Sequence, residues 1–410
     1  MRVLCTTLGS PSHGRAQLPL LRALAAAGHE VRVATNEELA PLFRHDDLHV
    51  LTCLPEFEPQ KFVDPAKDLA GIADTAALSP EEQQAAVMRF MVRALSGPMA
   101  EQLRELLRPV VLDFRPHLIL RDGMDLSSCL IAEELGIPQL PTPSGASNVL
   151  DPALVHPGLN ALRAQLGLPA QEDPLSIVRH GRVDYVPADF SFARHLPAPW
   201  AYRQTVNVDR SSVLPSWVAR LPTDRPLVWA ALGTALPMIQ QRRDQGQQPD
   251  MPFEIPDPAK LLQTIVEAAA ALDECTVIVA TAGVPVDTTA LPPHVHVTDR
   301  LPQPLLLECV DLFLTHGGFN SIREALRTGT PLAVLPQFGD QPSNAQRVEE
   351  LGLGRHITDP TPDGIAATCG QVLADPGAAA TARRARLEML ALPEIEHAVA
   401  DLERLVGEHA

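Results

Sequence analysis

The sequence predicts an α/β protein built from two Rossmann-like halves, each with its own parallel sheet and crossover helices. Three observations carry this prediction. First, 410 residues exceed what one hydrophobic core usually supports, so two domains are expected. Second, short apolar runs typical of buried strands alternate with helix-like segments along most of the chain. Third, residues 186–226 are rich in proline and lose this periodicity, which indicates a linker between the halves.

The clearest repeating unit stands at the N-terminus. Residues 2–7 form an apolar run that predicts a buried strand, and the loop that follows contains His13. A helical pattern of leucine and alanine then ends at Gly28, after which residues 29–34 predict a second strand. Strand, helix and strand together form one βαβ unit, the building block of a parallel sheet.

The sequence pattern divides the chain into four parts. An N-terminal Rossmann-like domain is expected over residues 1–205, a linker over 206–226 and a C-terminal Rossmann-like domain over 227–385. The last residues, 386–410, are expected to form a C-terminal helix that packs back on the N-terminal domain. Within the second half, the polar and glutamine-rich stretch 236–258 is expected to be a surface excursion.

Composition and charge exclude several classes of function. The formal net charge is −17, and such a surface repels nucleic acid and anionic membranes. No apolar run approaches the ~18 residues that cross a bilayer, and the N-terminus lacks the pattern of a signal peptide, so a cytoplasmic protein is expected. The six cysteines lie far apart without zinc-type spacing, so reduced thiols and no metal site are expected.

The segment most informative about chemistry is 311–336, where a strand, a glycine turn, a helix and a second strand follow one another. The turn and the helix start read HGGFNS at 316–321. Such glycines let backbone N–H groups approach a ligand, and the positive end of the helix dipole favours a phosphate. The side chains that can bind the phosphate or an attached ribose are His316, Asn320, Ser321 and Glu324. A tight turn of a doubly wound sheet explains the glycines equally well without a ligand.

This segment resembles the donor-binding signature of the GT-B glycosyltransferases, in particular the family-1 branch with its actinobacterial natural-product (macrolide or polyketide-type) enzymes. The similarity continues through QFGDQPSNA at 337–345 and the helix 347–351. The resemblance implies a GT-B fold, in which two Rossmann-like domains with parallel sheets face a central cleft. It also implies that the turn binds a sugar-nucleotide diphosphate, that Glu324 holds the ribose, and that Asp340 and Gln341 hold sugar hydroxyls. From the residues alone, the last two are ordinary polar residues of a loop.

The family's donor site can be carried over residue by residue. It falls on Gly233, Thr234, Arg300, Leu301, His316, Gly318, Asn320, Ser321, Glu324, Asp340 and Gln341. The pair at 233–234 resembles a second phosphate contact, although a simple strand-ending turn explains it equally well. The family often has a tryptophan that packs on the nucleobase where RLPQ stands at 300–303. Arg300 offers a different stacking surface, so the base is left open between a dTDP-linked and a UDP-linked donor.

In the N-terminal half, His13 is the candidate catalytic base. It follows the first strand, at the edge of the sheet where ligands of such folds bind, and an imidazole, with a pKa of about 6.5, suits proton transfer near neutrality. Its spacing to residues 28–31 resembles that of the family's catalytic histidine, although Ser12 precedes it where many relatives have glycine. Asp122 ends a buried strand, and the resemblance implies that its carboxylate hydrogen-bonds the imidazole, with Asp125 as its rival. Without the resemblance to the family, a histidine in a loop more often has no catalytic role than it acts as a base.

Together with the resemblance, these residues imply an inverting, metal-independent glycosyltransferase that needs no cofactor. It moves a (deoxy)sugar from a nucleoside-diphosphate donor to a hydroxyl of a small-molecule natural product, which His13 deprotonates. Two alternatives are a nucleotide-sugar epimerase of the same fold and a non-catalytic auxiliary protein of a partner transferase. An epimerase would need catalytic carboxylates, and Asp122 is the one residue that supports this alternative. The donor signature together with His13 argues against an auxiliary protein. The acceptor and the oligomeric state, a homodimer included, are left open.

Overall fold

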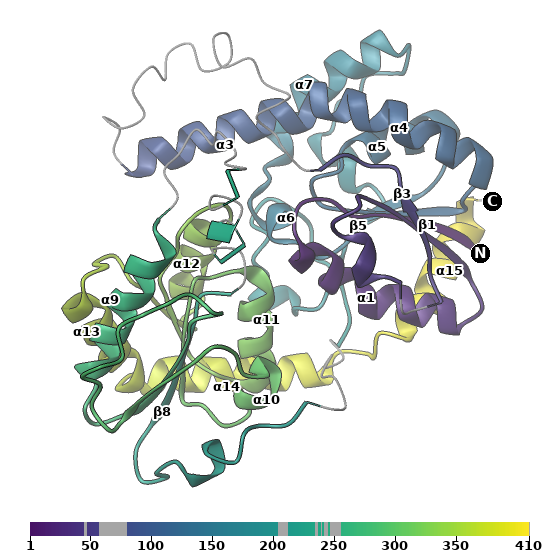
Figure 1. Ribbon diagram of the computed structural model, residues 1–410. Coiled ribbons are helices and arrows are strands. Elements are labelled where there is room, and N and C mark those ends of the chain that lie inside the picture. Colours follow the sequence, from purple (N-terminus) through teal and green to yellow (C-terminus); the bar gives the residue numbers. More distant parts are fainter. Residues whose placement is uncertain are drawn as a thin grey trace. The chain divides into compact units, whose positions relative to one another are not determined.

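The computed structural model describes residues 1–44, 47–56, 80–203, 212–233, 237, 238, 240, 241, 245, 246 and 256–409. The chain divides into two compact units (Figure 1). Among the described residues, unit 1 comprises 1–203 and 393–409, and unit 2 lies within 212–392. Each unit has its own parallel sheet with helices packed on it, so the predicted α/β architecture is confirmed. No helix in the described ranges has both the length and the apolar character needed to span a bilayer.

The parallel sheet of unit 1 has the strand order β3-β2-β1-β4-β5. Its strands are β1 (Arg2–Thr6), β2 (Glu30–Thr35), β3 (His49–Thr52), β4 (Leu118–Arg121) and β5 (Gln139–Pro141). The central strand β1 pairs with β2 and β4, and Cys5 stands opposite Val33 on one side and Leu120 on the other. The chain order changes direction between β1 and β4, and ligands of such sheets bind outside the carboxyl ends of the strands at this point.

Helices cover both faces of the unit 1 sheet (Figure 1). They are α1 (Pro11–Ala26), α3 (Pro80–Ser96), α4 (Pro98–Phe114), α5 (Ser127–Leu135), α6 (Gly145–Val149), α7 (Pro152–Gln165) and α15 (His397–His409). Short elements are η1 (Ala40–Leu42), η4 (Pro174–Val178), β6 (Val183–Asp184), η5 (Ala188–Phe190) and β7 (Trp200–Ala201). Leu4 packs in a core with α3, α4, α5 and α7, whereas Val3 packs with α1 and α15, because neighbouring side chains of a strand point to opposite faces.

The parallel sheet of unit 2 has the strand order β10-β9-β8-β11-β12-β13. Its strands are β8 (Leu227–Ala231), β9 (Thr276–Ala280), β10 (Val295–Thr298), β11 (Leu312–Thr315), β12 (Leu332–Val334) and β13 (Gly354–His356). Its helices are η6 (Val218–Arg220), α9 (Pro258–Ala270), α10 (Gln303–Leu306), α11 (Phe319–Thr328), α12 (Gln341–Glu350), α13 (Pro362–Leu373) and α14 (Pro376–Ala391). The order changes direction between β8 and β11, which places the segments after these two strands at the switch point.

Two boundaries differ from the sequence prediction. His13 was expected in a loop, but α1 already begins at Pro11, because the fixed φ of proline suits the first position of a helix. The segment 386–410 was expected to be one helix, but α14 ends and α15 begins on either side of Pro393. Proline disfavours the helical conformation of the residue before it, and Leu392 is indeed extended. Most of the excursion 236–258 and part of the linker lie outside the described residues.

Candidate active site

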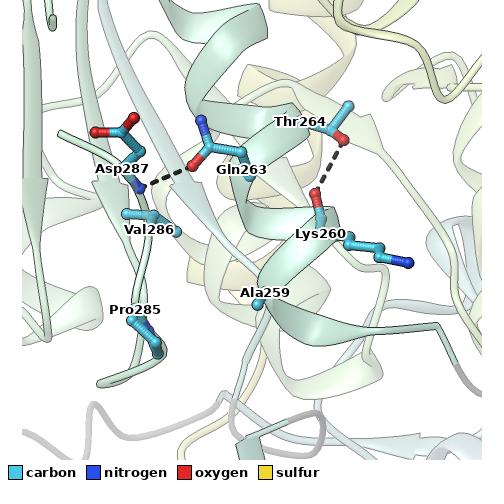
Figure 2. Close-up of a pocket in the computed structure, with 7 residues that line it drawn as sticks. All are labelled: Ala259, Lys260, Gln263, Thr264, Pro285, Val286 and Asp287. Atoms are coloured by element: carbon cyan, nitrogen blue, oxygen red, sulfur yellow. Dashed lines mark hydrogen bonds between the residues drawn. The ribbon is translucent and has the colours of Figure 1, made fainter. Parts of the chain in front are cut away.

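A cavity of about 600 Å³ opens on unit 2 between the start of α9 and the loop after β9 (Figure 2). It is lined by Ala259, Lys260, Gln263, Thr264, Pro285, Val286 and Asp287. The Gln263 side-chain oxygen accepts a hydrogen bond from the Asp287 N–H at 2.9 Å, which joins its two walls. None of the residues predicted for catalysis or donor binding lines this cavity, so the candidate site is built from other segments.

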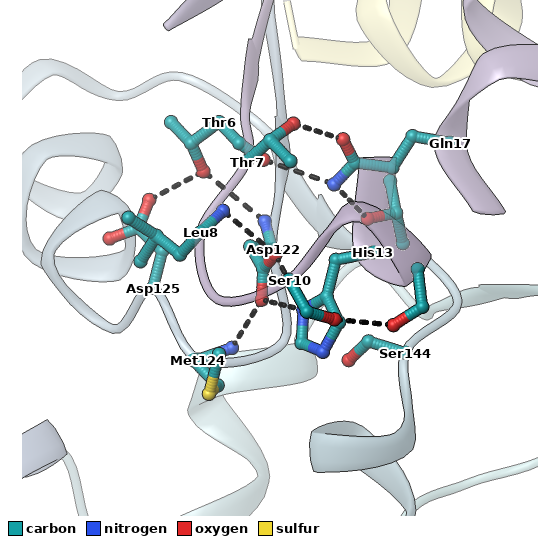
Figure 3. A network of polar contacts seen from close by, with 12 residues as sticks. Thr6, Thr7, Leu8, Ser10, His13, Gln17, Asp122, Met124, Asp125 and Ser144 are labelled. Atoms are coloured by element: carbon teal, nitrogen blue, oxygen red, sulfur yellow. Dashed lines mark hydrogen bonds and ion pairs between the residues drawn. The ribbon is translucent and has the colours of Figure 1, made fainter. Parts of the chain in front are cut away.

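His13 and Asp122 form a hydrogen-bonded pair in unit 1 (Figure 3). His13 lies in the first turn of α1, and Asp122 directly follows β4. The imidazole Nδ1 is 2.9 Å from Oδ2 and 3.1 Å from Oδ1 of the carboxylate. The Asp122 side chain is fully buried, whereas that of His13 is 14% exposed. Neighbouring strands therefore bring the two residues together at the carboxyl edge of the sheet.

Backbone groups hold the Asp122 carboxylate in place. The N–H of Leu8 donates to Oδ2 at 3.0 Å, and the N–H of Met124 donates to Oδ1 at 3.0 Å. The Asp122 backbone N–H in turn donates to the hydroxyl oxygen of Thr6 at 3.2 Å. A buried carboxylate requires such donors to offset its lost hydration. The backbone thus fixes the position of the Asp122 carboxylate that accepts from the His13 imidazole.

Asp125, the rival carboxylate, is bonded elsewhere among the described residues. Its oxygens accept hydrogen bonds from the hydroxyls of Thr6 at 2.7 Å and Ser127 at 2.5 Å. They also accept from the N–H of Ser128 at 3.2 Å and from its hydroxyl. The geometry therefore assigns Asp122, and not Asp125, as the partner of His13.

In unit 2 the imidazole of His316 lies between two glycines. A Cβ atom on Gly318 would stand 2.4 Å from Nε2 of the ring, and one on Gly233 would stand 2.7 Å from Cε1. Both distances are shorter than real Cβ contacts, so any other residue at either position would displace the ring. Three predicted donor-site residues thus come together here, whereas their predicted neighbour Thr234 lies outside the described residues.

Burial lowers the pKa of His316 to about 4. At neutral pH the ring is therefore uncharged, with one N–H donor and one acceptor nitrogen. Its Nδ1 atom is 3.4 Å from the hydroxyl of Thr315, the last residue of β11. His316 can consequently offer a ligand a neutral hydrogen-bond donor but no full positive charge.

The helix α11 begins directly after the glycine turn. Gly317 has a φ of +84°, and a Cβ atom there would stand 2.6 Å from Cγ1 of Val334. Gly318 occupies the N-cap position and has no side chain that could cap the helix. The positive end of the helix dipole at this turn favours an anion. At the other end α11 stops at Gly329, whose φ of +71° is the left-handed conformation that commonly ends a helix.

Gln303, which the sequence prediction omitted, contacts two predicted donor-site residues. Its Nε2 donates to Oε2 of Glu324 at 2.7 Å and lies 3.4 Å from Oγ of Ser321. Its Oε1 accepts from the indole N–H of Trp229 at 3.3 Å. The one sequence signal that could have indicated a role for Gln303 is its position in the RLPQ motif at 300–303. Arg300 of the same motif is exposed and makes no hydrogen bond or ion pair within the described part of the chain.

Asp340 and Gln341 stand at the start of α12. The amide of Asn344 donates to Oδ2 of Asp340 at 2.8 Å and to the carbonyl of Gly317 at 2.9 Å. This amide, which the sequence prediction also missed, joins the start of α12 to the glycine turn. The side-chain oxygen of the buried Gln341 accepts from the N–H of Gln337 at 2.8 Å and from the N–H of Phe338 at 3.3 Å.

Two Rossmann-like units, a glycine turn before a helix and a His–Asp pair define the class of GT-B glycosyltransferases. Residues 22–233 match the family described as "Erythromycin biosynthesis protein CIII-like, N-terminal domain", and residues 263–405 match the corresponding C-terminal domain. The chain therefore belongs to the erythromycin biosynthesis protein CIII-like family and is a natural-product glycosyltransferase. The epimerase and auxiliary-protein alternatives are not favoured.

Similar proteins match over nearly their whole length. L-demethylnoviosyl transferase of Streptomyces niveus is 29% identical over 402 residues, which cover 94% of this chain and 93% of the relative. The 10-deoxymethynolide desosaminyltransferase of Streptomyces venezuelae is 26% identical over 442 residues, covering 100% and 98%. Among solved structures, spinosyn rhamnosyltransferase SpnG has a TM-score of 0.70 at 24% identity, covering 98% of this chain and 100% of SpnG. The fold of the chain is thus that of the GT-B enzymes.

Proposed function

We propose that the chain is an inverting transferase that moves a deoxysugar from a nucleoside-diphosphate donor to a hydroxyl of a natural product. The observation that carries this proposal is the His13–Asp122 pair. An acceptor hydroxyl becomes a better nucleophile when a base removes its proton as it attacks. Because Nδ1 faces the buried carboxylate, Nε2 is the nitrogen assigned to accept that proton. Asp122 then stabilises the imidazolium that forms, as the acid of a catalytic triad does.

The segments around His316 are proposed to bind the donor diphosphate. Negative charge grows on the leaving phosphate as the bond to the sugar breaks, and fixed dipoles aimed at that charge stabilise the transition state. The open N-terminus of α11, the neutral ring of His316 and the hydroxyl of Ser321 supply such dipoles. The glycines at 233 and 318 are assigned the task of keeping the ring in place.

Other contacts are proposed to recognise the rest of the donor. Glu324, held by Gln303, is assigned to the ribose hydroxyls, because a carboxylate is a strong acceptor for such groups. Asp340 and the amide nitrogen of Gln341 are assigned to hydroxyls of the sugar. Arg300, together with Leu301, is assigned to the nucleobase, on whose face a guanidinium can stack.

We propose a dTDP-linked donor in preference to a UDP-linked one, and a polyketide-derived acceptor. SpnG, VinC and the Streptomyces sp. SF2575 glycosyltransferase SsfS6 have each been solved with thymidine diphosphate. SpnG has also been solved with spinosyn aglycone. Relatives named for transfer to 10-deoxymethynolide and aklavinone support the same acceptor class.

Mass spectrometry of a reaction mixture tests this function. The protein is incubated with a panel of dTDP- and UDP-sugars and a panel of polyketide aglycones, and each mixture is searched for aglycone plus one sugar. The proposal predicts a glycosylated product that appears only when both substrates are present. Conversion of the nucleotide sugar into an isomer without any acceptor would instead indicate an epimerase.

A further inference from the structure

The helical turn that carries His13 has a sequence that forms helix weakly. Gly14 and Pro19 both lie inside α1, and glycine and proline are the poorest helix formers. Pro19 has no N–H, so it cannot donate to the carbonyl one turn earlier, at Arg15. The side chain of Ser10 at the N-cap makes no capping hydrogen bond. The position of His13 therefore depends on contacts outside the helix backbone.

Gln17, one turn after His13, makes such contacts (Figure 3). Its Nε2 donates to the carbonyl of Thr6 at 3.0 Å and to the hydroxyl oxygen of Thr142 at 2.9 Å. Its Oε1 accepts from the hydroxyl of Thr7. The side chain is only 1% exposed, so water cannot replace these partners without a rearrangement of the core.

A fourth partner fixes the orientation of this amide. The thiol of Cys5 lies 3.4 Å from Oε1 of Gln17. Burial and the charge of Asp122 raise the pKa of Cys5, so the thiol stays protonated and acts as a donor. Both N–H groups of the amide donate and its oxygen accepts twice, which uses its full hydrogen-bonding capacity. A reversed amide would place its oxygen against the Thr6 carbonyl oxygen, which can only accept.

The network continues to the strand that carries Asp122. The hydroxyl of Thr142 donates to the carbonyl of Arg121 at 2.9 Å, and Arg121 immediately precedes Asp122. Thr6, whose carbonyl accepts from Gln17, also accepts the Asp122 N–H on its hydroxyl oxygen. One buried amide thus connects the turn of His13, through Thr6 and Thr142, with the Arg121–Asp122 peptide group that leads into its carboxylate partner.

We propose that Gln17 is a positioning residue for sugar transfer, whose buried amide holds the first turn of α1 so that His13 stays within hydrogen-bond distance of Asp122. This inference rests on the proposed role of His13 as the base. Gln17 is buried beneath that turn and acts through the imidazole. A displacement of a catalytic group by 1 Å can cost about 100-fold in rate, so the loss of these four contacts is expected to lower turnover.

The variant Gln17→Met tests the proposal, because methionine has a similar shape but cannot donate. We expect kcat to fall about 10- to 100-fold while the donor KM changes less than about twofold. The control is Tyr202→Phe, which removes another, partly buried hydrogen bond of unit 1, from the Tyr202 hydroxyl to Asp401 at 2.7 Å. It should lower the thermal midpoint and leave kcat unchanged. A Gln17→Met enzyme with the kcat of the wild type would overturn the proposal.

A double-mutant comparison separates positioning from general damage to the fold. In a His13→Ala background, Gln17→Met should not lower the residual rate further, because the group it positions is already gone. The same fold-loss with and without His13 would show that Gln17 acts independently of the imidazole and would refute the proposal.

A second measurement does not depend on activity. The proton on Nδ1 of His13, shared with the Asp122 carboxylate, is expected to give a downfield NMR signal that Asp122→Asn removes. Gln17→Met should shift or abolish this signal, whereas Tyr202→Phe should retain it. If no sugar transfer is found, the transferase proposal fails. The NMR signal of the His13 Nδ1 proton still tests whether Gln17 positions the imidazole. An unchanged signal in Gln17→Met contradicts it.

Discussion

The Nδ1 atom of His13 lies 2.9 Å from Oδ2 of Asp122, although 109 positions separate the two residues in the sequence. The contact arises because β1 and β4 are neighbours in the sheet, so that the start of α1 and the residue after β4 share one edge. The carboxylate favours the tautomer with a proton on Nδ1, which leaves Nε2 as the basic nitrogen. This assignment follows from the contact and leads to the first prediction.

Replacing the carboxylate of Asp122 should slow transfer while donor binding persists. We expect Asp122→Asn to lower kcat by about 100- to 10,000-fold, because the amide can neither fix the tautomer nor stabilise the imidazolium. The dissociation constant for dTDP, measured by calorimetry, should change less than about twofold, since the residues proposed to bind the donor lie in unit 2.

Asp125→Asn is the matched control for that substitution. It also converts a buried carboxylate into an amide, but its partners are Thr6, Ser127 and Ser128. It is expected to lower the thermal midpoint and to reduce kcat less than about tenfold, the factor equivalent to 1.4 kcal/mol. A larger loss of kcat in Asp125→Asn than in Asp122→Asn would contradict the assignment of the pair.

A side chain at position 233 should weaken binding of the diphosphate. The Cβ of Gly233→Ala would overlap the His316 ring at 2.7 Å, so the ring must move away from its donor position. Loss of one hydrogen bond to a charged group corresponds to roughly 1.5–3 kcal/mol, or tenfold and more in the dissociation constant for dTDP.

Gly352→Ala provides the control for Gly233→Ala. Both glycines have a φ of +69°, so both substitutions introduce the same kind of backbone strain. The nearest atom to a Cβ on Gly352 is the Thr381 hydroxyl oxygen at 3.6 Å, an ordinary contact. Calorimetry with dTDP should therefore find wild-type affinity in Gly352→Ala, and equal weakening in both variants would refute the role given to His316.

The low pKa of His316 predicts a loss of stability in acid. Its pKa of about 4 in the folded protein is below the ordinary value, which is about 6.5. As the pH falls through this window, the unfolded chain binds a proton that the folded chain does not, so the free energy of unfolding decreases. At pH 5 the decrease amounts to about 2 kcal/mol for this residue.

Urea denaturation at pH 8 and pH 5 measures this effect. Other histidines with lowered pKa values, such as His180 and His356, act in the same direction, so the comparison with His316→Gln isolates one residue. The variant should lose about 2 kcal/mol less than the wild type between the two pH values. The same loss in both proteins would contradict the burial of a neutral ring.

Asn344 is expected to influence recognition of the sugar more than recognition of the nucleotide. Asn344→Leu removes the donor to the Asp340 carboxylate and to the Gly317 carbonyl, while it keeps the branched shape of the side chain. We expect kcat/KM for the nucleotide sugar to fall about tenfold, equivalent to 1.4 kcal/mol, with a smaller change in dTDP affinity. Equal losses for both ligands would show that the amide supports only the glycine turn.

Local signals predicted much of the fold. The predicted strands 2–7 and 29–34 correspond to β1 and β2, with bounds that differ by at most one residue, because a short apolar run marks each of them within the sequence. The glycine turn and its neighbours were also recognisable, since they lie in one continuous segment of the sequence. The start of α1 was missed, although Pro11 at the first helical position was a usable signal.

Contacts between distant segments could not be predicted in the same way. The choice of Asp122 over Asp125 depends on which carboxylate faces α1, and this is set by the pairing of β1 with β4. The amides of Gln17, Gln303 and Asn344 have no pattern of their own in the sequence, and their partners lie up to 125 positions away. Only the folded chain brings these groups together.

The most direct test of the account compares wild type and His13→Ala in two measurements on the same samples. Mass spectrometry follows the glycosylated acceptor, and a thermal shift with dTDP reports donor binding, because a ligand of the folded state raises the midpoint. The account predicts that His13→Ala loses at least about 100-fold in transfer rate and keeps the full shift with dTDP. Transfer at the wild-type rate in His13→Ala would contradict it.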